Sequence, residues 1–126
     1  MNLWKWDLTR LELINWVQAC LNMGVTTFDL ADIYGDYTCE NLFGRVLSAE
    51  PALRHQMQII TKSGINMVSQ NRSDYHVKHY DTSQQHILQS VENSLHQLIT
   101  ETIDVLLIHR PIVSWLPARW QKRSRN

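Results

Sequence analysis

The feature that most constrains the fold is a repeated alternation of helical and extended segments. Three short runs rich in β-branched and apolar residues have the character of strands, at residues 25–31, 58–62 and 103–108. Segments with helical periodicity precede the first run and separate the others. Strands that alternate with helices are parallel and are joined by right-handed crossovers. The pattern therefore predicts an α/β fold of about three parallel strands alternating with helices.

Start and stop signals support the first and third helices. Thr9 stands three residues before Glu12, which is the spacing of a capping box, and Gly24 supplies a stop. Thr82 and Gln85 have the same spacing, so we expect a second capping box there. The apolar residues that follow recur on one helical face: Ile87, Leu88, Val91, Leu95 and Leu98.

The second helix and two loops complete the pattern. An amphipathic stretch around residues 42–47 ends before Pro51, and residues 34–37 are predicted to form a loop. Residues 65–80 are polar and aromatic with no sustained period. A loop of that length is uncommon unless it is functional or disordered. The run at residues 103–108 is almost continuously apolar, as expected of a parallel strand that is covered on both faces.

Two architectures use this repeating unit, the open doubly wound sheet and the TIM (β/α)8 barrel. The chain has 126 residues, enough for one domain, whereas a barrel of this type needs about 250. Three strands cannot close such a barrel, and the alternation alone leaves both architectures open.

Composition narrows the classes of partner and location. Lys plus Arg and Asp plus Glu number 12 each, so no net field attracts nucleic acid or an anionic membrane. The longest apolar run, residues 105–108, is far shorter than the roughly 20 residues that span a bilayer. No secretory signal is visible, and Cys20 and Cys39 are too far apart for a redox or zinc motif. We therefore expect a soluble, cytoplasmic protein without a nucleic-acid or membrane partner.

Two local patterns could indicate a metal site or a nucleic-acid site, but each has a simpler explanation. His76 and His79 have a spacing seen in metal sites, but no helical period or cysteine accompanies them, so no metal is expected. Trp115 and Trp120 lie beside basic residues and could stack on single-stranded nucleic acid. An irregular hydrophobic tail is the more common explanation.

Four functional side chains follow the ends of the three predicted strands. Asp29 and Tyr34 follow the first strand, Lys62 ends the second, and His109 follows the third. The carboxyl ends of parallel strands meet at one edge, where the βα loops of such folds carry function. We therefore expect these four residues to share one site.

The set has a chemical logic. A tyrosine hydroxyl, with an ordinary pKa of about 10, is a poor acid at neutral pH, but a neighbouring ammonium group favours its phenolate. A carboxylate would hold the lysine charged and in place, and an imidazole could hydrogen-bond a substrate carbonyl. Together they would form a general acid for carbonyl reduction, with a cofactor supplying hydride.

At these residues the sequence resembles one family. Residues 25–35 are similar to the aldo-keto reductase segment that carries the catalytic Asp and Tyr. Residues 59–62 resemble the strand that ends in the catalytic Lys, and residues 104–111 the strand that ends in the active-site His. The order and spacing agree over roughly residues 7–111.

The resemblance implies a role for each residue. Tyr34 would be the general acid, Lys62 the partner that lowers its pKa, Asp29 the charge that positions Lys62, and His109 the group that orients the substrate. The family reduces aldehydes and ketones with NADPH, bound without a glycine-rich loop. Asp29 is also a candidate cofactor contact.

The resemblance covers only the N-terminal part of the family. We expect a partial aldo-keto reductase barrel domain at residues 1–111 and a basic tail outside the family pattern at 112–126. In the family, the groups that hold the cofactor lie on the later strands, which the resemblance does not cover. The chain is therefore expected to be truncated and inactive alone. The alternative is a non-catalytic interaction module, or a pseudogene product, that docks through its open sheet edge. Self-association or a complementary half-barrel would cover that edge.

Overall fold

The computed structural model describes residues 5–110 and contains one main sheet. Its strands are β1 (Thr27–Asp29), β2 (Gln58–Ser63) and β5 (Val105–Ile108), all parallel, in the order β1-β2-β5. The predicted α/β fold of three parallel strands is confirmed. β1 and β5 are shorter than the predicted runs, and Asp104 pairs with β2 through a side chain as well as its backbone.

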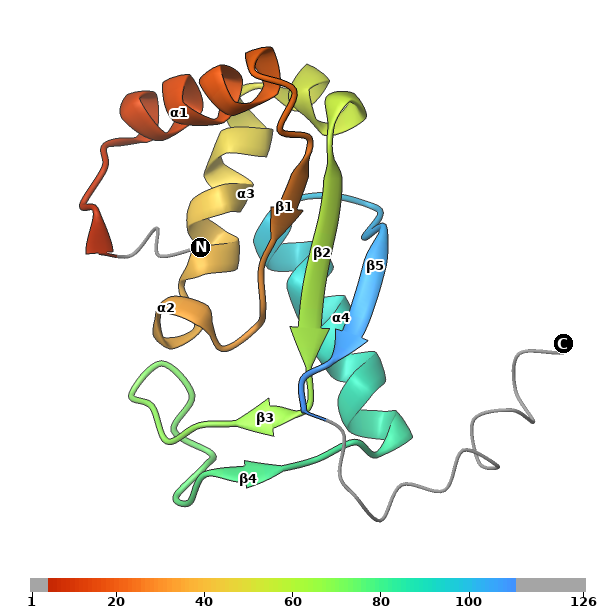
Figure 1. Ribbon diagram of the computed structural model, residues 1–126. Helices are drawn as coiled ribbons and strands as arrows, with labels where there is room; N and C mark the ends of the chain where they lie inside the picture. The colour runs from red at the N-terminus through yellow and green to blue at the C-terminus, as the bar shows by residue number, and fades with distance from the viewer. Residues whose placement is uncertain (1–4, 111–126) are drawn as a thin grey trace, which may run out of the picture.

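Helices cover one face of this sheet. The long helices are α1 (Arg10–Asn22), α3 (Cys39–Ala49) and α4 (Gln84–Leu98). Figure 1 shows α3 and α4 behind the sheet, with α1 crossing near its upper end, and a short turn of 3-10 helix (Pro51–Gln56) precedes β2. The core lies between the helices and the sheet; its fully buried side chains include Val17, Leu30, Phe43, Val46, Ile59 and Leu98.

The first helix begins as predicted. Thr9 Oγ1 accepts a hydrogen bond from the Glu12 backbone N–H at 3.3 Å, and the Thr9 backbone N–H donates to Glu12 Oε2 at 2.8 Å. Cys20 and Cys39 are both buried as free thiols.

The start and the buried face of α4 differ from the prediction. Ser83, not Thr82, caps the helix, and its Oγ accepts from the His86 backbone N–H at 3.3 Å. The third helical position is therefore His86, so the reciprocal bond of a capping box is not made. Leu88 is 54% exposed, whereas Ser90 and Ser94 are buried. Polar residues can occupy this face because acidic side chains across the interface accept their hydrogen bonds.

The two segments predicted as loops contain regular structure. Residues 65–80 form an antiparallel hairpin of β3 (Ile65–Asn66) and β4 (His79–Tyr80). Tyr37 Oη, outside the hairpin, accepts from the Met67 backbone N–H at 2.7 Å and holds it against the body of the protein. Residues 34–37 form a short helical turn, α2 (Tyr34–Tyr37), which is interrupted by left-handed backbone at Gly35 (φ +60°) and Asp36 (φ +55°).

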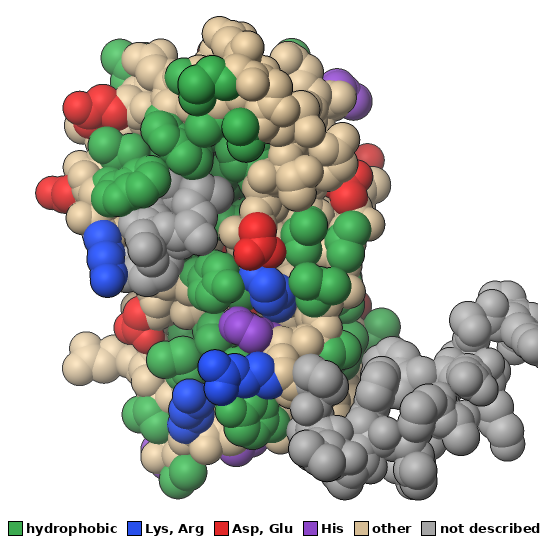
Figure 2. All heavy atoms as spheres, viewed as in Figure 1, with side chains coloured by type: hydrophobic (Ala, Val, Ile, Leu, Met, Phe, Trp, Pro, Cys, Tyr) green, Lys and Arg blue, Asp and Glu red, His purple; other side chains and the backbone are tan. Residues whose placement is uncertain are grey.

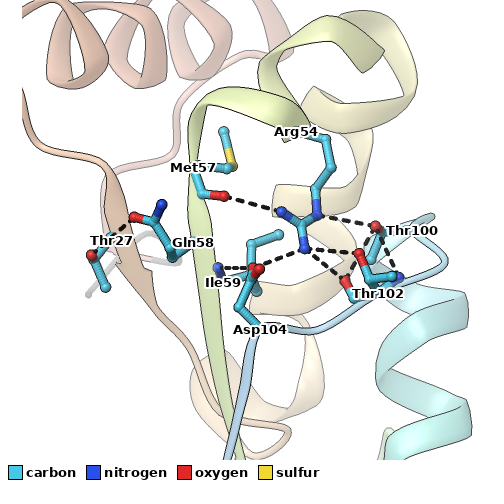
Figure 3. A network of polar contacts seen from close by, with 8 residues as sticks. All are labelled: Thr27, Arg54, Met57, Gln58, Ile59, Thr100, Thr102 and Asp104. Carbon is cyan, nitrogen blue, oxygen red and sulfur yellow. Dashed lines mark hydrogen bonds and ion pairs between the residues drawn. The ribbon is translucent and has the colours of Figure 1, made fainter.

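At the amino ends of the strands one arginine joins several segments. The Arg54 guanidinium donates to Met57 O, Thr100 Oγ1, Thr102 O and Asp104 Oδ2, as Figure 3 shows. The Asp104 carboxylate also accepts from the Ile59 backbone N–H at 2.7 Å. These contacts tie the turn before β2 to the loop before β5 and set the register of the two strands.

The third strand departs most from expectation. The predicted burial of both faces of residues 103–108 is wrong, because Val105, Leu106 and Leu107 are 41%, 36% and 42% exposed. Within the described residues β5 pairs only with β2, so its other edge is open. On the face seen in Figure 2, hydrophobic side chains lie where β5 runs in Figure 1. The strand is apolar, but no described segment covers it.

Three further predictions concern the tail, a membrane-spanning helix and the pair His76 and His79. The tail at residues 112–126, with Trp115 and Trp120, lies outside the described residues. Between residues 5 and 110 no helix is long and apolar enough to cross a membrane. His79 lies in the hairpin, where its Nε2 is 3.1 Å from the Asn66 side-chain amide nitrogen.

Candidate active site

Lys62 is the centre of the candidate site. It lies near the carboxyl end of β2, and its Nζ is 2.7 Å from Asp29 Oδ1 at the end of β1. The same ammonium group donates to Tyr34 Oη at 3.0 Å and to the Leu30 carbonyl at 2.8 Å. Three predicted site residues, from β1, β2 and α2, are thus joined through one nitrogen atom.

Its surroundings keep Lys62 protonated. Burial by itself lowers the pKa of the ammonium group, but hydrogen bonds to Asp29 and Tyr34 and the Asp29 charge act in the opposite direction. The net effect raises the pKa above its ordinary value. A permanent positive charge therefore stands 3.0 Å from a phenol oxygen.

The backbone between Asp29 and Tyr34 places the tyrosine over the lysine. The Leu30 N–H donates to Ile60 O at 2.8 Å and the Asp32 N–H donates to Lys62 O at 3.1 Å, which continues the parallel pairing beyond β1. Leu30 and Ala31 are fully buried, so the segment is anchored before it turns. The Tyr34 N–H then donates to Ala31 O at 3.1 Å, which closes the turn and begins α2.

His109 joins the site from the third strand. Its backbone N–H donates to Ser63 O at 2.7 Å, and its ring meets the Tyr34 ring edge-on at 6.0 Å between centroids. Burial, followed by the charges of Lys62 and Arg110, lowers the pKa of the imidazole. The ring is therefore neutral at pH 7, and its buried Nδ1 has no hydrogen-bond partner among residues 5–110.

All four predicted residues therefore meet at one end of the sheet. Figure 2 shows an acidic, a basic and a histidine side chain one below another near the middle of the visible face. Asp29 is exposed and its side chain is 52% accessible, whereas that of Lys62 is 13% accessible. The charged pair thus lies at a surface that a small molecule can reach.

Two buried carboxylates beneath this site were not predicted from the sequence. Ser90 Oγ donates to Asp32 Oδ2 at 3.0 Å, and Glu40 accepts from Thr61 Oγ1 at 2.6 Å and from Ser94 Oγ at 3.0 Å. Burial, only partly offset by the Ser90 hydrogen bond, raises the Asp32 pKa to about 6. Burial likewise raises the pKa of Glu40.

These contacts support the segment that carries Tyr34. They attach the loop after β1 and the start of α3 to α4, directly behind the strand that holds Lys62. Two serines four residues apart on an otherwise apolar helix face were the available signal, because buried hydroxyls require acceptors.

Parallel strands that alternate with helices and carry polar groups at their carboxyl ends occur in doubly wound sheets and in TIM barrels, and the solved structures that this chain resembles assign it to part of a TIM barrel. The sequence profile of the Aldo/keto reductase family matches residues 2–118. The chain belongs to this family. The matched range runs past residue 111, where the domain boundary was predicted.

Individual relatives agree with this assignment. The chain is 49% identical over 112 residues to an uncharacterized oxidoreductase of Bacillus subtilis, which covers 86% of this chain and 37% of the relative. It is 50% identical over 95 residues to a 6-dehydroglucose reductase of Agrobacterium fabrum, covering 75% and 32% of the two chains. Among solved structures, a glycerol dehydrogenase from Gluconobacter oxydans superposes with a TM-score of 0.66 at 29% identity. That superposition covers 81% of this chain and 30% of the dehydrogenase. The chain thus spans about a third of the length of the proteins it matches.

Proposed function

We propose that this chain supplies the proton-donating part of an NADPH-dependent carbonyl reductase site. The observation that carries the proposal is the Lys62 ammonium group, which contacts both the Asp29 carboxylate and the Tyr34 hydroxyl. A tyrosine is most effective as a general acid when the phenolate that it forms is stabilised as the proton leaves.

In the proposed reaction Tyr34 is the proton donor. As hydride reaches the carbonyl carbon of the substrate, negative charge develops on the carbonyl oxygen. Tyr34 Oη donates its proton to that oxygen, which leaves an alcohol and a phenolate. The Lys62 ammonium group at 3.0 Å stabilises the phenolate, and Asp29 keeps Lys62 charged and oriented.

His109 has the role of orienting the substrate. Its ring packs edge-on against Tyr34, so a carbonyl oxygen bound to Tyr34 Oη comes within reach of the imidazole. Because burial holds the ring neutral, its N–H can donate a hydrogen bond to that oxygen without adding a second positive charge beside Lys62.

NADPH is the proposed cofactor and supplies the hydride when bound. Only one oxygen of Asp29 contacts Lys62, and the side chain is half exposed, so the carboxylate can accept a hydrogen bond from the cofactor. An aldo-keto reductase from Klebsiella pneumoniae with the same fold is solved in complex with NADPH, which supports the choice. The substrate is proposed to be a small aldehyde or ketone. The relatives that act on 6-dehydroglucose favour a polar one.

We further propose that activity requires the remaining barrel strands. The chain spans about a third of its relatives, and the open face of β5 leaves the site uncovered on one side. A site open to water weakens the electrostatic interactions on which this chemistry depends. The 126-residue chain alone is therefore proposed to be inactive.

The test compares two proteins. One is the chain alone, and the other is residues 1–110 fused to the remainder of the Bacillus subtilis relative. Both are titrated with NADPH by cofactor fluorescence and assayed with a panel of carbonyl compounds, with Tyr34→Phe as the matched control. We expect saturable binding and Tyr34-dependent turnover in the fusion only. Equal turnover by Tyr34→Phe in a folded fusion would refute the role of Tyr34, and turnover by the chain alone would refute the need for the remaining strands.

A second candidate function rests on a different observation, the exposed apolar strand β5. Its side chains and free edge can pair with another strand, as an interaction module would. The occupant we propose is the complementary part of an aldo-keto reductase barrel supplied by another polypeptide. Co-purification of the chain with that part, without NADPH turnover, would favour the module. A cytoplasmic location and the boundary at residue 111 remain predictions.

A further inference from the structure

A cavity lies apart from the Lys62 site, between the β3–β4 hairpin and α4. Its volume is about 360 Å³, within the range of small-ligand pockets. One wall is formed by hairpin residues 70–75, and the other by one face of α4 that includes His86, Gln89, Ser90 and Asn93. Figure 1 shows the hairpin below the sheet, close to the beginning of α4.

Several polar atoms on the α4 side lack protein partners. His86 is 9% exposed, and its buried Nε2 makes no hydrogen bond with any described residue. Within residues 5–110, the side-chain amides of Gln89 and Asn93 also make no hydrogen bond. Ser90 donates to Asp32, which leaves its oxygen able to accept. A buried polar group without a partner is costly, which applies to His86, whereas Gln89 is exposed and Asn93 is partly buried. Together these side chains offer a ligand both donors and acceptors of hydrogen bonds.

The charges around the cavity argue against an anion. Arg72 and Asp74, both in the lining, carry opposite charges. The Arg72 guanidinium also lies over the Tyr37 ring at 4.7 Å, and the Asp32 carboxylate lies directly behind Ser90. A phosphate group would therefore meet no net positive field. The lining is almost entirely polar, which equally disfavours an apolar ligand.

The protonation state of His86 also favours a neutral, polar ligand. Burial lowers the pKa of its imidazole, so the ring is neutral at pH 7. A neutral ring offers one donor and one acceptor, as a side-chain amide does. The hydroxyl group is the ligand group that can satisfy either role at each position.

We propose that this cavity binds a neutral ligand with several adjacent hydroxyl groups, either a cyclic sugar or an open-chain polyol. The hydroxyls bond to His86, Gln89, Ser90 and Asn93. This inference is independent of the carbonyl reductase proposal, because every lining residue lies in the described chain and none belongs to the Lys62 site.

The experiment is a titration of the ¹⁵N-labelled full chain followed by NMR. The probes are D-glucose for a cyclic ligand, sorbitol for an open-chain polyol and inorganic phosphate for an anion. We expect saturable shifts at the side-chain amides of Gln89 and Asn93 with glucose, sorbitol or both, and none with phosphate. Saturation by phosphate, or no saturable shift with either polyol, would overturn the proposal.

Matched variants locate the binding. Gln89→Ala removes a lining amide and is expected to weaken the affinity by about tenfold, the equivalent of one hydrogen bond. Gln85→Ala, one turn earlier on the same helix and outside the cavity, is expected to bind like the parent chain. Tyr34→Phe tests whether the ligand occupies the Lys62 site, and unchanged sorbitol affinity is the expected result. Affinity that falls with Tyr34→Phe and not with Gln89→Ala would assign binding to the Lys62 site and refute a second one.

Discussion

The two ends of the main sheet carry the same kind of ion pair in opposite roles. At the carboxyl ends, Lys62 and Asp29 are 2.7 Å apart; at the amino ends, Arg54 and Asp104 are 2.8 Å apart. Each pair joins two segments that are distant in sequence. Their lengths are nearly equal, so length does not distinguish them.

The partners beyond each pair make the difference. Arg54 donates to two backbone carbonyls and two threonine hydroxyls, so its planar guanidinium fastens the turn before β2 to the loop before β5. Lys62 instead directs its ammonium group at a phenol oxygen beside a half-exposed carboxylate. Arginine suits multiple fixed contacts, while lysine acts as a compact charge. In barrels of this kind the amino end of the sheet contributes stability and the carboxyl end activity.

The strongest test of this contrast is Lys62→Met in the fusion protein. Loss of the ammonium group removes stabilisation of the Tyr34 phenolate, so kcat/KM is expected to fall by at least about 100-fold. Urea unfolding should change by only about 1 kcal/mol, because Asp29 is half exposed and remains hydrated. Steady-state kinetics and unfolding curves on the same samples measure both effects. A large loss of stability with little loss of activity would reverse the assignment of the two ends.

The buried acid near the carboxyl end yields a pH-dependent prediction. Burial raises the Asp32 pKa from 3.8 to about 6, so the folded protein holds this proton more tightly than the unfolded chain. The resulting stabilisation is complete below pH 4 and is lost as the pH rises through 6. Asp32→Asn keeps an acceptor for Ser90 without ionising. The parent chain should therefore lose about 2–3 kcal/mol more than Asp32→Asn between pH 4 and 7.5.

Urea unfolding of both proteins across that range measures the difference. The Glu40 charge is one of the causes that raise the Asp32 pKa, so the measured difference includes the coupling between these two carboxyl groups. Parallel stability profiles for the two proteins would show that Asp32 ionises normally in the folded state.

Arg54→Ala tests the opposite end of the sheet. The substitution leaves Asp104 and the carbonyls of Met57 and Thr102 without this donor, so the free energy of unfolding should fall by about 2 kcal/mol. In the fusion protein kcat/KM should change by less than about threefold, since the Lys62 contacts remain. A loss of turnover comparable with that of Lys62→Met, in a folded sample, would contradict the division of roles.

The smallest expected effect comes from Arg54→Lys, which keeps the positive charge but removes the planar guanidinium group with its several N–H donors. One ammonium group can reach Asp104 but cannot reach all the other acceptors, so a loss of about 1 kcal/mol is expected. Thermal or urea unfolding distinguishes this value from that of Arg54→Ala. Equal losses of unfolding free energy for both variants would mean that the positive charge at position 54 contributes little to stability.

The sequence predicted the parts of the molecule that depend on local pattern. The Thr9–Glu12 capping box, the three parallel strands and the positions of Asp29, Tyr34, Lys62 and His109 at strand ends all follow from spacing along the chain. Strand direction makes the carboxyl ends converge, so the grouping of these residues was predictable before any distance was known. Their catalytic roles remain proposals.

Other features depended on residues far apart in the chain. The hairpin at residues 65–80 has no periodic signal, because each of its strands is two residues long and is held by Tyr37 from another segment. The Arg54 contacts join residues separated by about fifty positions, and nothing near Arg54 in the sequence indicates them. Ser90 and Ser94 interrupt an apolar pattern for a reason that lies on other segments, at Asp32 and Glu40.

By itself the sequence determined the alternation of elements, the parallel sheet and the edge at which four functional side chains meet. Only the tertiary structure decided which apolar residues are buried, and β5 is the clearest case. Its composition is that of a strand covered on both faces, yet Val105, Leu106 and Leu107 remain exposed. Hydrophobicity indicates that burial would be favourable, whereas burial itself requires a second surface, and no described part of this chain provides one.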